Sequence, residues 1–203
     1  MTDFVPDAPV HTFVARCRNT LMRPIRIGDA AGLFPQIHGA NDVLRWLCWD
    51  GPETLDELRG RYATWRYGRD PYAGYMFALA SAHDGTVIGE GSLRFDDHPG
   101  VGELGYWLGS THHGHGHGRD AVELLTRVGF EICGAFALTA RVKEGNDASI
   151  HVLNRTGFVQ ERAPRIETGC EGGADDGIAW IFSTTRRSDD RRSDRLDVRI
   201  DVN

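Results

Sequence analysis

A short run of glycine and histidine carries most of the chemical information in this sequence. The segment ELGYWLGSTHHGHGHGRDAVELL, residues 103–125, begins as a strand-like alternation and ends with apolar residues at helical spacing. Gly114, Gly116 and Gly118 lie at the junction. Strand, glycine-rich loop and helix N-terminus in this order form an anion site, because glycine lets loop amides point inward and the helix dipole adds partial positive charge. The three glycines therefore predict a phosphate or pyrophosphate site.

Two other interpretations of this loop are weaker. Gly116 to Ala121 fits the short pattern G-x-G-x-x-A, but a dinucleotide fold expects that pattern after the first strand of an alternating βαβ chain. Here it follows an antiparallel meander past the middle of the chain. Metal binding is the second interpretation, and its candidate ligands are His112, His113, His115 and His117. Such a run has no cysteine or acidic partner at ligand spacing, so we expect adventitious affinity and no resident metal.

The loop resembles motif A of the GNAT superfamily of N-acetyltransferases, which carries [Q/R]-x-x-G-x-[G/A] before a helix. His113 to Gly118 occupies those positions, with histidine replacing the usual Gln or Arg at the first. Two further segments resemble the branch that acetylates ribosomal-protein N-termini (RimJ/RimL-type). LMRPIRIGDAA, residues 21–31, resembles its opening strand and turn, and NDASIHVLNRTGF, residues 146–158, resembles its Asn-Ser segment. The strand Glu103 to Leu108 resembles its "EiGYwl" strand.

This resemblance implies direct transfer of an acetyl group from acetyl-CoA to an amine. It implies cofactor contacts in the loop, on the preceding strand and at the next helix: a main-chain N–H near Leu108, then His113, Gly114, Gly116, Gly118, Arg119 and Asn146. Ser149 is the candidate general acid toward the departing thiolate, with bonding to backbone as an equal alternative. Leu153 stands where many relatives have a tyrosine, which rules out a tyrosine acid there.

Two carboxylates are candidates for the general base. Glu103 lies on the strand leading to the loop, and Glu90 on the neighbouring strand. Each can instead be a paired or exposed strand carboxylate, and some relatives need no dedicated base. Trp46 belongs to an aromatic cluster before the meander. The family resemblance implies that this region covers the acceptor site, so the cluster can line a pocket, with core packing as the default.

The elements that must position these residues follow from periodicity and turn signals. Seven strands are expected, at residues 20–27, 75–82, 86–95, 101–108, 135–142, 158–162 and 177–184. Helices are expected at about 28–38, 54–67, 119–131 and 146–156. Apolar residues at helical spacing indicate the helix at 119–131, and Asn146 is the expected N-cap of the helix at 146–156. Pro24 predicts an edge strand. The fold class is α/β (α+β): the GNAT fold, a mixed, mainly antiparallel sheet of about seven strands with flanking helices.

Length and composition indicate the domain organisation and exclude some classes of protein. The 203 residues suit one domain, at 20–185, with an arm at 1–19 and a charged, disordered tail at 186–203. The net charge of −6 excludes a general nucleic-acid binder, and no apolar run reaches membrane-spanning length. Four widely spaced cysteines argue against a zinc ribbon or a disulfide scaffold and fit a reducing cytoplasm.

Two functions therefore stand at this point. The first is an acetyl-CoA-dependent N-acetyltransferase, acting in the cytoplasm as a monomer or homodimer on a protein N-terminus or a small-molecule amine, with no metal. The second is a non-catalytic acyl-CoA-binding or sensing protein on the same fold. The altered loop entry at His113 and the unassigned base motivate the second.

Overall fold

A computed structural model describes residues 13–65, 74–95, 100–161, 166–167, 178–185 and 199–202. The strands are β1 (Phe13–Cys17), β2 (Thr20–Pro24), β3 (Gly74–Ser81), β4 (Val87–Arg94), β5 (Val101–Leu108), β6 (Ala137–Lys143), β7 (Val159–Gln160), β8 (Ile166–Glu167), β9 (Ile178–Thr185) and β10 (Arg199–Val202). The helices are α1 (Ala30–Ile37), α2 (Asn41–Leu44), α3 (Leu55–Trp65), α4 (His117–Arg127) and α5 (Asp147–Arg155), with short helical turns η1 (Ile27–Asp29), η2 (Ser110–His112) and η3 (Val128–Ile132).

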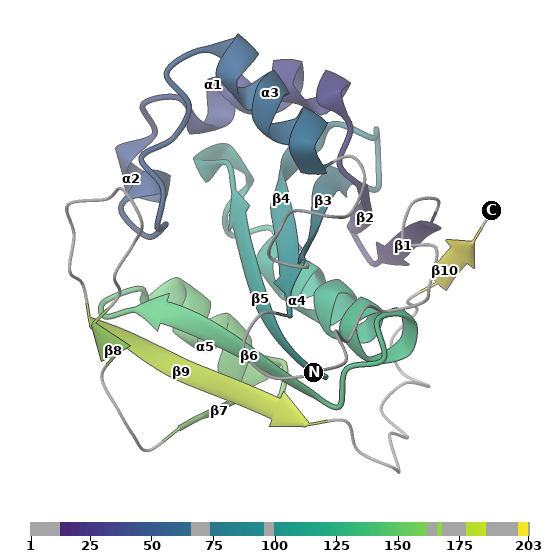
Figure 1. Ribbon diagram of the computed structural model, residues 1–203, viewed down its shortest axis with the longest axis vertical. Helices are drawn as coiled ribbons and strands as arrows, with labels where there is room; N and C mark the ends of the chain where they lie inside the picture. The colour runs from purple at the N-terminus through teal and green to yellow at the C-terminus, as the bar shows by residue number, and fades with distance from the viewer. Residues whose placement is uncertain are drawn as a thin grey trace.

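One sheet connects all ten strands. Its order is β10-β1-β2-β3-β4-β5-β6-β9-β7, with β8 beside β9 (Figure 1). Within the described residues, β5 and β6 pair in parallel and every other pairing is antiparallel. The predicted class, a mixed and mainly antiparallel sheet with flanking helices, is confirmed. No helix in the described part of the chain has the length and apolar content needed to cross a membrane.

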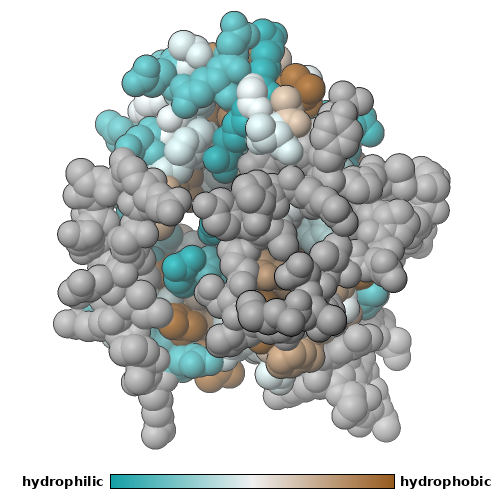
Figure 2. All heavy atoms as spheres, viewed as in Figure 1, coloured by the Kyte–Doolittle hydropathy of each residue, from teal (hydrophilic) through white to brown (hydrophobic). Residues whose placement is uncertain are grey.

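Helices cover the sheet on both faces, which divides the apolar core in two. Tyr75, Phe77 and Leu79 of β3 belong to the cluster under α4 and α5, whereas Met76 and Ala78 belong to the cluster under α1 and α3. Because successive strand residues point to opposite faces, a central strand covered on both sides is apolar throughout. Figure 2 shows that the helices of the second layer present mainly hydrophilic residues to solvent.

Local signals fix the helix starts as predicted. Thr54 Oγ1 accepts a hydrogen bond from the Glu57 amide at 3.1 Å, and Asn146 Oδ1 accepts one from the Ser149 amide at 3.2 Å. These bonds satisfy helix amides that have no partner inside the helix. Once started, α4 buries Ala121, Leu124 and Leu125 against the sheet, and each such leucine stabilises the fold by about 1.5–3 kcal/mol.

The ends of the chain depart from the prediction. The arm expected at 1–19 contains β1, and the tail expected at 186–203 contains β10, which pairs with β1 from Phe13↔Val202 to Arg16↔Arg199. The expectation of an unstructured arm and tail is therefore wrong for residues 13–17 and 199–202. Residues 1–12, 186–198 and 203 lie outside the described residues. Together with β8, these two strands raise the count above the predicted seven.

Two smaller expectations are also wrong. Pro24 does not mark an edge strand, because β2 lies between β1 and β3. The pairing of β1 with β2 stops at Ala15↔Met22, so Pro24 lies past the last pair and its missing N–H costs no ladder bond. Cys17 and Cys133 are free and buried, as expected for reduced thiols, but Cys48 is disulfide-bonded.

Candidate active site

The candidate site begins where β5 separates from β6. The two strands pair only from Val101↔Ala137 to Glu103↔Thr139. On its other side β5 stays paired with β4 from Arg94↔Glu103 to Gly89↔Leu108, the end of the strand. Figure 1 shows β5 diverging from β6 toward the helical layer. One side of the second half of β5 therefore faces an opening instead of a strand.

The alternation of backbone hydrogen bonds along β5 shows which backbone groups face this opening. The Gly109 amide donates to the Ile88 carbonyl of β4 at 2.9 Å. Because backbone polar groups alternate between the two neighbours along a strand, Trp107 also points its N–H and C=O at β4. Tyr106 and Leu108 then point theirs at the opening. The His113 ring agrees, since its Nε2–H donates to the Leu108 carbonyl at 3.0 Å from that side.

The glycine loop closes the end of the opening. Gly114 and Gly116 have φ of +77° and +85°, a region that side chains rarely adopt. Gly116 caps α4, and the first bond inside the helix runs from the Asp120 amide to the Gly116 carbonyl at 3.1 Å. The amides of residues 117–119 therefore have no carbonyl within the helix and carry its positive dipole end. The predicted order of strand, glycine loop and helix is confirmed.

A cavity of about 820 Å³ joins these parts. Its floor and one end come from the β5 terminus and the glycine loop. Its two walls come from α2 with the residues after it, and from the start of α5. The described residues of the cavity include Asp42, Trp46, Tyr106, Leu108, His113, Gly114, Gly116, Gly118, Arg119, Asn146 and Ser149. Every cofactor residue predicted from the sequence lines this one cavity.

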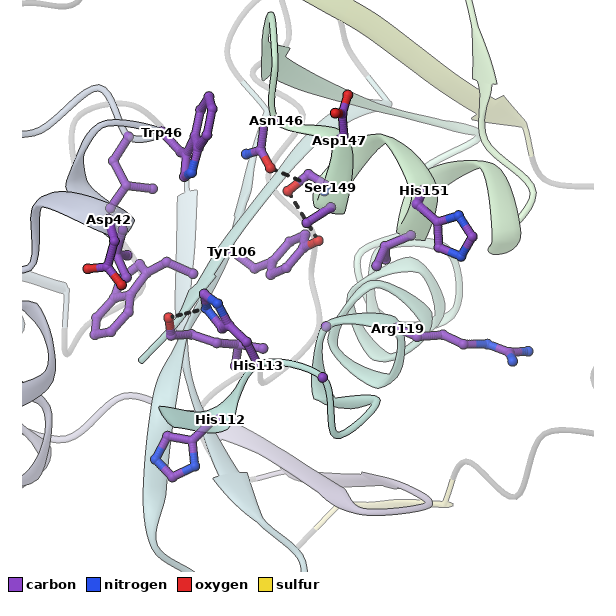
Figure 3. A pocket seen from close by; sticks show the side chains of 18 of the residues that line it. Asp42, Trp46, Tyr106, His112, His113, Arg119, Asn146, Asp147, Ser149 and His151 are labelled. Carbon is purple, nitrogen blue, oxygen red and sulfur yellow. Dashed lines mark hydrogen bonds between the residues drawn. The ribbon is translucent and has the colours of Figure 1, made fainter. Parts of the chain in front are cut away.

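Two hydroxyl groups meet inside the cavity. The Tyr106 hydroxyl donates to Ser149 Oγ at 3.4 Å, a long contact, and both lie beside the Asn146 cap (Figure 3). Burial raises the pKa of Tyr106, which keeps this phenol protonated at neutral pH. The structure therefore brings together a serine predicted from the sequence and a tyrosine that was not. Leu153, by contrast, is buried in the core.

The two side chains flanking the glycines point in different directions. His113 turns into the cavity and meets Leu108, as described above. The Arg119 guanidinium points away from the cavity in Figure 3, and its Nε donates to Glu123 at 2.9 Å. Arg119 therefore faces the cavity with its main chain at the helix start, and its side chain neutralises a buried carboxylate.

A comparison of the sequence with known protein families agrees with this geometry. Residues 19–159 match the acetyltransferase (GNAT) domain family, which is more than half of the chain. This chain belongs to the GNAT acetyltransferase family. An N-acetyltransferase of uncharacterised role, p20 from Bacillus licheniformis, is 31% identical over 112 residues, 55% of this chain. That match spans 62% of the relative's own length.

Solved GNAT structures share the fold at low sequence identity. RimJ from Mycobacterium smegmatis, in complex with CoA-disulfide, has a TM-score of 0.73 at 20% identity and covers 91% of this chain and 90% of its own. RimL, a ribosomal L7/L12 α-N-protein acetyltransferase in complex with coenzyme A, has a TM-score of 0.74 at 15% identity. It covers 87% of this chain and 99% of its own. At these identities the likeness establishes the fold.

The two candidate bases do not reach the GNAT cavity. Glu103 lies at the paired end of β5, outside the cavity lining. Its carboxylate accepts from Arg141 Nε at 2.8 Å and contacts Arg94 at 3.4 Å. The prediction of Glu103 as the general base is therefore wrong. Glu103 is an ion-paired strand carboxylate, the alternative that the sequence also allowed.

Glu90 is buried under the opposite helical layer. It is 4% exposed and accepts a hydrogen bond from the Tyr62 hydroxyl of α3. Burial raises the pKa of Glu90 above its ordinary value. Glu90 does not line the cavity either, and its contacts are those of a buried polar pair.

Sequence reasoning missed Tyr106 and Asp42, and it did not favour the cavity-lining placement of Trp46. The sequence predicted Tyr106 only as part of a strand. Its phenol contacts Ser149 because β5 directs the Tyr106 side chain toward α5. Asp42 lies on α2, a helix of four residues that the sequence did not predict. Trp46 lines the cavity opposite Asn146, as in the aromatic-lined alternative and not in the default of core packing (Figure 3). No local signal marks these residues, because their roles depend on which elements face one another.

Proposed function

We propose that this protein transfers the acetyl group of acetyl-CoA directly to a primary amine. The open edge of β5 is the observation that carries the proposal. It presents the Leu108 amide to a cavity that ends in a phosphate-binding type of loop, and this arrangement suits an extended thioester with a pyrophosphate at one end. The family membership and the coenzyme A complexes of RimJ and RimL support it.

Main-chain groups would hold the cosubstrate. The amides of Gly118 and Arg119, at the positive end of α4, would bind the pyrophosphate. Asn146, at the start of α5, would line the path of the pantetheine arm. The Leu108 N–H would donate to the thioester carbonyl and stabilise the negative charge that develops on it during attack. Such donors need no reorganisation, because the strand already fixes them.

Ser149 and Tyr106 would manage the leaving group. The amine nitrogen attacks the carbonyl carbon, a C–N bond forms and the C–S bond breaks. The departing thiolate takes a proton from Ser149 Oγ, and the Tyr106 hydroxyl resupplies it through the contact described above. Burial raises the pKa of Tyr106, so the phenol is protonated at the start of each turnover, and the tyrosinate left by the transfer recovers a proton from water. The amine gives up its proton to water, since neither Glu103 nor Glu90 reaches the cavity.

The acceptor would be an amine with cationic character, either a protein N-terminus or a small molecule. Asp42 and the Trp46 ring form the wall opposite Ser149. A hydrogen bond from Ser110 lowers the pKa of Asp42, so this carboxylate is charged at neutral pH. The resemblance to ribosomal-protein acetyltransferases favours a protein N-terminus.

A binding and turnover experiment tests the proposal. Calorimetry with acetyl-CoA should show binding, and an amine panel that includes N-terminal peptides should release free thiol. Gly116→Asp should abolish binding, because it places charge, bulk and an unfavourable φ beside the phosphates. Gly39→Asp is the matched control: it has φ of +66° and open space at its Cβ, and lies outside the cavity lining.

The second function, acyl-CoA binding without catalysis, is separated by the same experiment. The absence of a predicted carboxylate base from the cavity favours it. Binding of acetyl-CoA with no thiol release across the panel would replace the catalytic proposal by this one. Absence of binding altogether would overturn both.

A further inference from the structure

The glycine–histidine loop has a second face that the acetyl-transfer proposal does not use. A separate cavity of about 640 Å³ lies outside the loop, between it and the β3–β4 hairpin. His112, His115 and His117 line this cavity from the loop side, and His83 lines it from the hairpin. Figure 3 shows His112 and His113 pointing to different sides of the loop. His115 and His117 line only this second cavity, whereas His112 lies where the two cavities meet and lines both.

His117 lies close to both of the other loop imidazoles. The ring centres of His112 and His117 are 6.5 Å apart, and those of His115 and His117 are 6.4 Å apart. Two imidazoles bound to one zinc ion, at Zn–N of about 2.0–2.1 Å, have ring centres about 5 Å apart. The rings must therefore approach by about 1.5 Å. His115 is exposed and lies between two glycines, so its side chain can rotate toward His117, and the half-buried His112 ring must make a similar rotation.

Buried groups hold the His117 ring in a ligand-ready form. His117 Nδ1 lies 2.9 Å from Thr20 Oγ1, and the Thr20 hydroxyl donates to Asp120 Oδ2 at 3.2 Å. A hydroxyl has a single proton, so both contacts are satisfied when His117 Nδ1–H donates to Thr20. Nε2 then carries the free lone pair. Metal-bound histidines show the same pattern, with the second ring nitrogen donating to a buried acceptor that fixes the ring.

The buried acidic groups near His117 help to orient its ring and do not form a second metal site. Cys17, Asp120 and Glu123 lie close enough to share an ion. However, the Arg18 guanidinium already fills that place, at 2.9 Å from Asp120 and 2.6 Å from Glu123. Arg18 thus anchors Asp120, and Asp120 in turn anchors Thr20 and His117. The sequence offered no acidic partner for the histidines, and tertiary contacts supply one.

We propose that His112, His115 and His117 bind one divalent transition-metal ion of the kind that prefers imidazole, such as Zn²⁺ or Ni²⁺. Imidazole nitrogen suits these ions, and the shared cavity leaves room for water at the remaining positions. The site adjoins the cavity of the proposed acetyl transfer, which His112 also lines, but the contacts that orient His117 do not involve Ser149, Tyr106 or Leu108.

Zinc titration of the full-length chain without an affinity tag tests the site. Calorimetry should show one Zn²⁺ per chain, and Ni²⁺ should compete. His115→Ala and His117→Ala should each weaken Zn²⁺ binding at least tenfold. His113→Ala is the matched control, because it removes a histidine of the same loop that faces the other cavity, and Zn²⁺ affinity should stay within twofold. His115 is exposed, so its variant leaves the fold intact.

Thr20→Val separates a built site from loose histidine affinity. It keeps all three imidazoles and removes the hydroxyl that orients His117, so Zn²⁺ affinity should fall about tenfold. Circular dichroism would confirm that the variant is folded. No stoichiometric Zn²⁺ binding by the wild-type chain would overturn the proposal. Equal losses in His113→Ala and His115→Ala would also overturn it, since they would indicate adventitious affinity of a histidine-rich loop.

Discussion

The two neighbours of β5 differ in a way that explains the site. Toward β4, β5 is paired from Glu103 to Leu108, and the strands approach so closely at Gly89 that a Cβ there would lie 2.1 Å from the Trp107 carbonyl oxygen. Toward β6, only three pairs form before the strands separate. A sheet normally satisfies its backbone groups on both sides. Here one side has no ladder, and the backbone groups of Tyr106 and Leu108 face the cavity instead of a strand.

The pairing with β4 therefore holds β5 rigid enough for its other side, which faces the cavity, to bind a ligand. Unpaired backbone groups bind a thioester well only if they are held still, and the tight β4 pairing holds Tyr106 and Leu108 in place. Changes on the β4 side should therefore affect folding, whereas changes on the open side should affect catalysis or binding.

The largest effect is expected from Gly89→Val, which breaks the tight side. The added side chain meets the Trp107 main chain, which cannot move without disrupting the ladder, so we expect a loss of about 3 kcal/mol or more in the free energy of unfolding. Urea denaturation measures this. Gly60→Ala, in α3 with open space at the Cβ, is the control and should be neutral or slightly stabilising. A Gly89 variant as stable as wild type would show that this approach is not structurally required.

The open side is tested by Ser149→Ala and Tyr106→Phe. Loss of a general acid should lower kcat by about 100-fold or more for Ser149→Ala. Tyr106→Phe should have a smaller effect, because Tyr106 acts through Ser149. In the double variant the Tyr106 change should add almost nothing, since residues acting as a unit are not additive. Acetyl-CoA affinity, measured by calorimetry, should be unchanged in all three. Fully multiplicative effects on kcat would contradict the relay.

Glu90 on β4 should make stability depend on pH. Burial raises its pKa above the ordinary value of 4.5, so the folded state holds the proton more tightly than the unfolded state. The resulting stabilisation is present below about pH 4.5 and is lost as pH rises through the folded pKa. Glu90→Gln stays neutral, so its Tm should match wild type in acid and exceed it increasingly toward pH 8. A constant Tm difference across thermal scans from pH 4 to 8 would refute this.

The smallest effect is expected from Glu103→Gln, at the end of β5 where both neighbours are still paired. Its partners Arg94 and Arg141 are about half exposed, so the ion pairs contribute on the order of 0.5 kcal/mol. Because Glu103 lies outside the cavity, kcat should change less than twofold. A fall of 100-fold in steady-state thiol release would restore Glu103 as the base.

The sequence identified the elements and the cofactor loop because their signals are local. Gly114 and Gly116 adopt conformations that few other residues tolerate, and Asn146 caps the next helix with its own side chain. Alternation and turn residues located β3 to β6 within a few positions. The strands at the chain ends were missed because β1 and β10 depend on each other, across almost the whole length of the chain.

The sequence by itself thus determined the family, the fold class and part of the cavity lining, namely Leu108, the glycine loop and Asn146. Tertiary structure decided which side chains act together. It moved Glu103 out of the site by pairing it with two arginines, brought Tyr106 to Ser149, and linked Asp120 through Thr20 to His117. The physical reason is that torsional preference and capping act within a few residues, whereas ion pairs and proton relays join groups from strands and helices far apart in the chain.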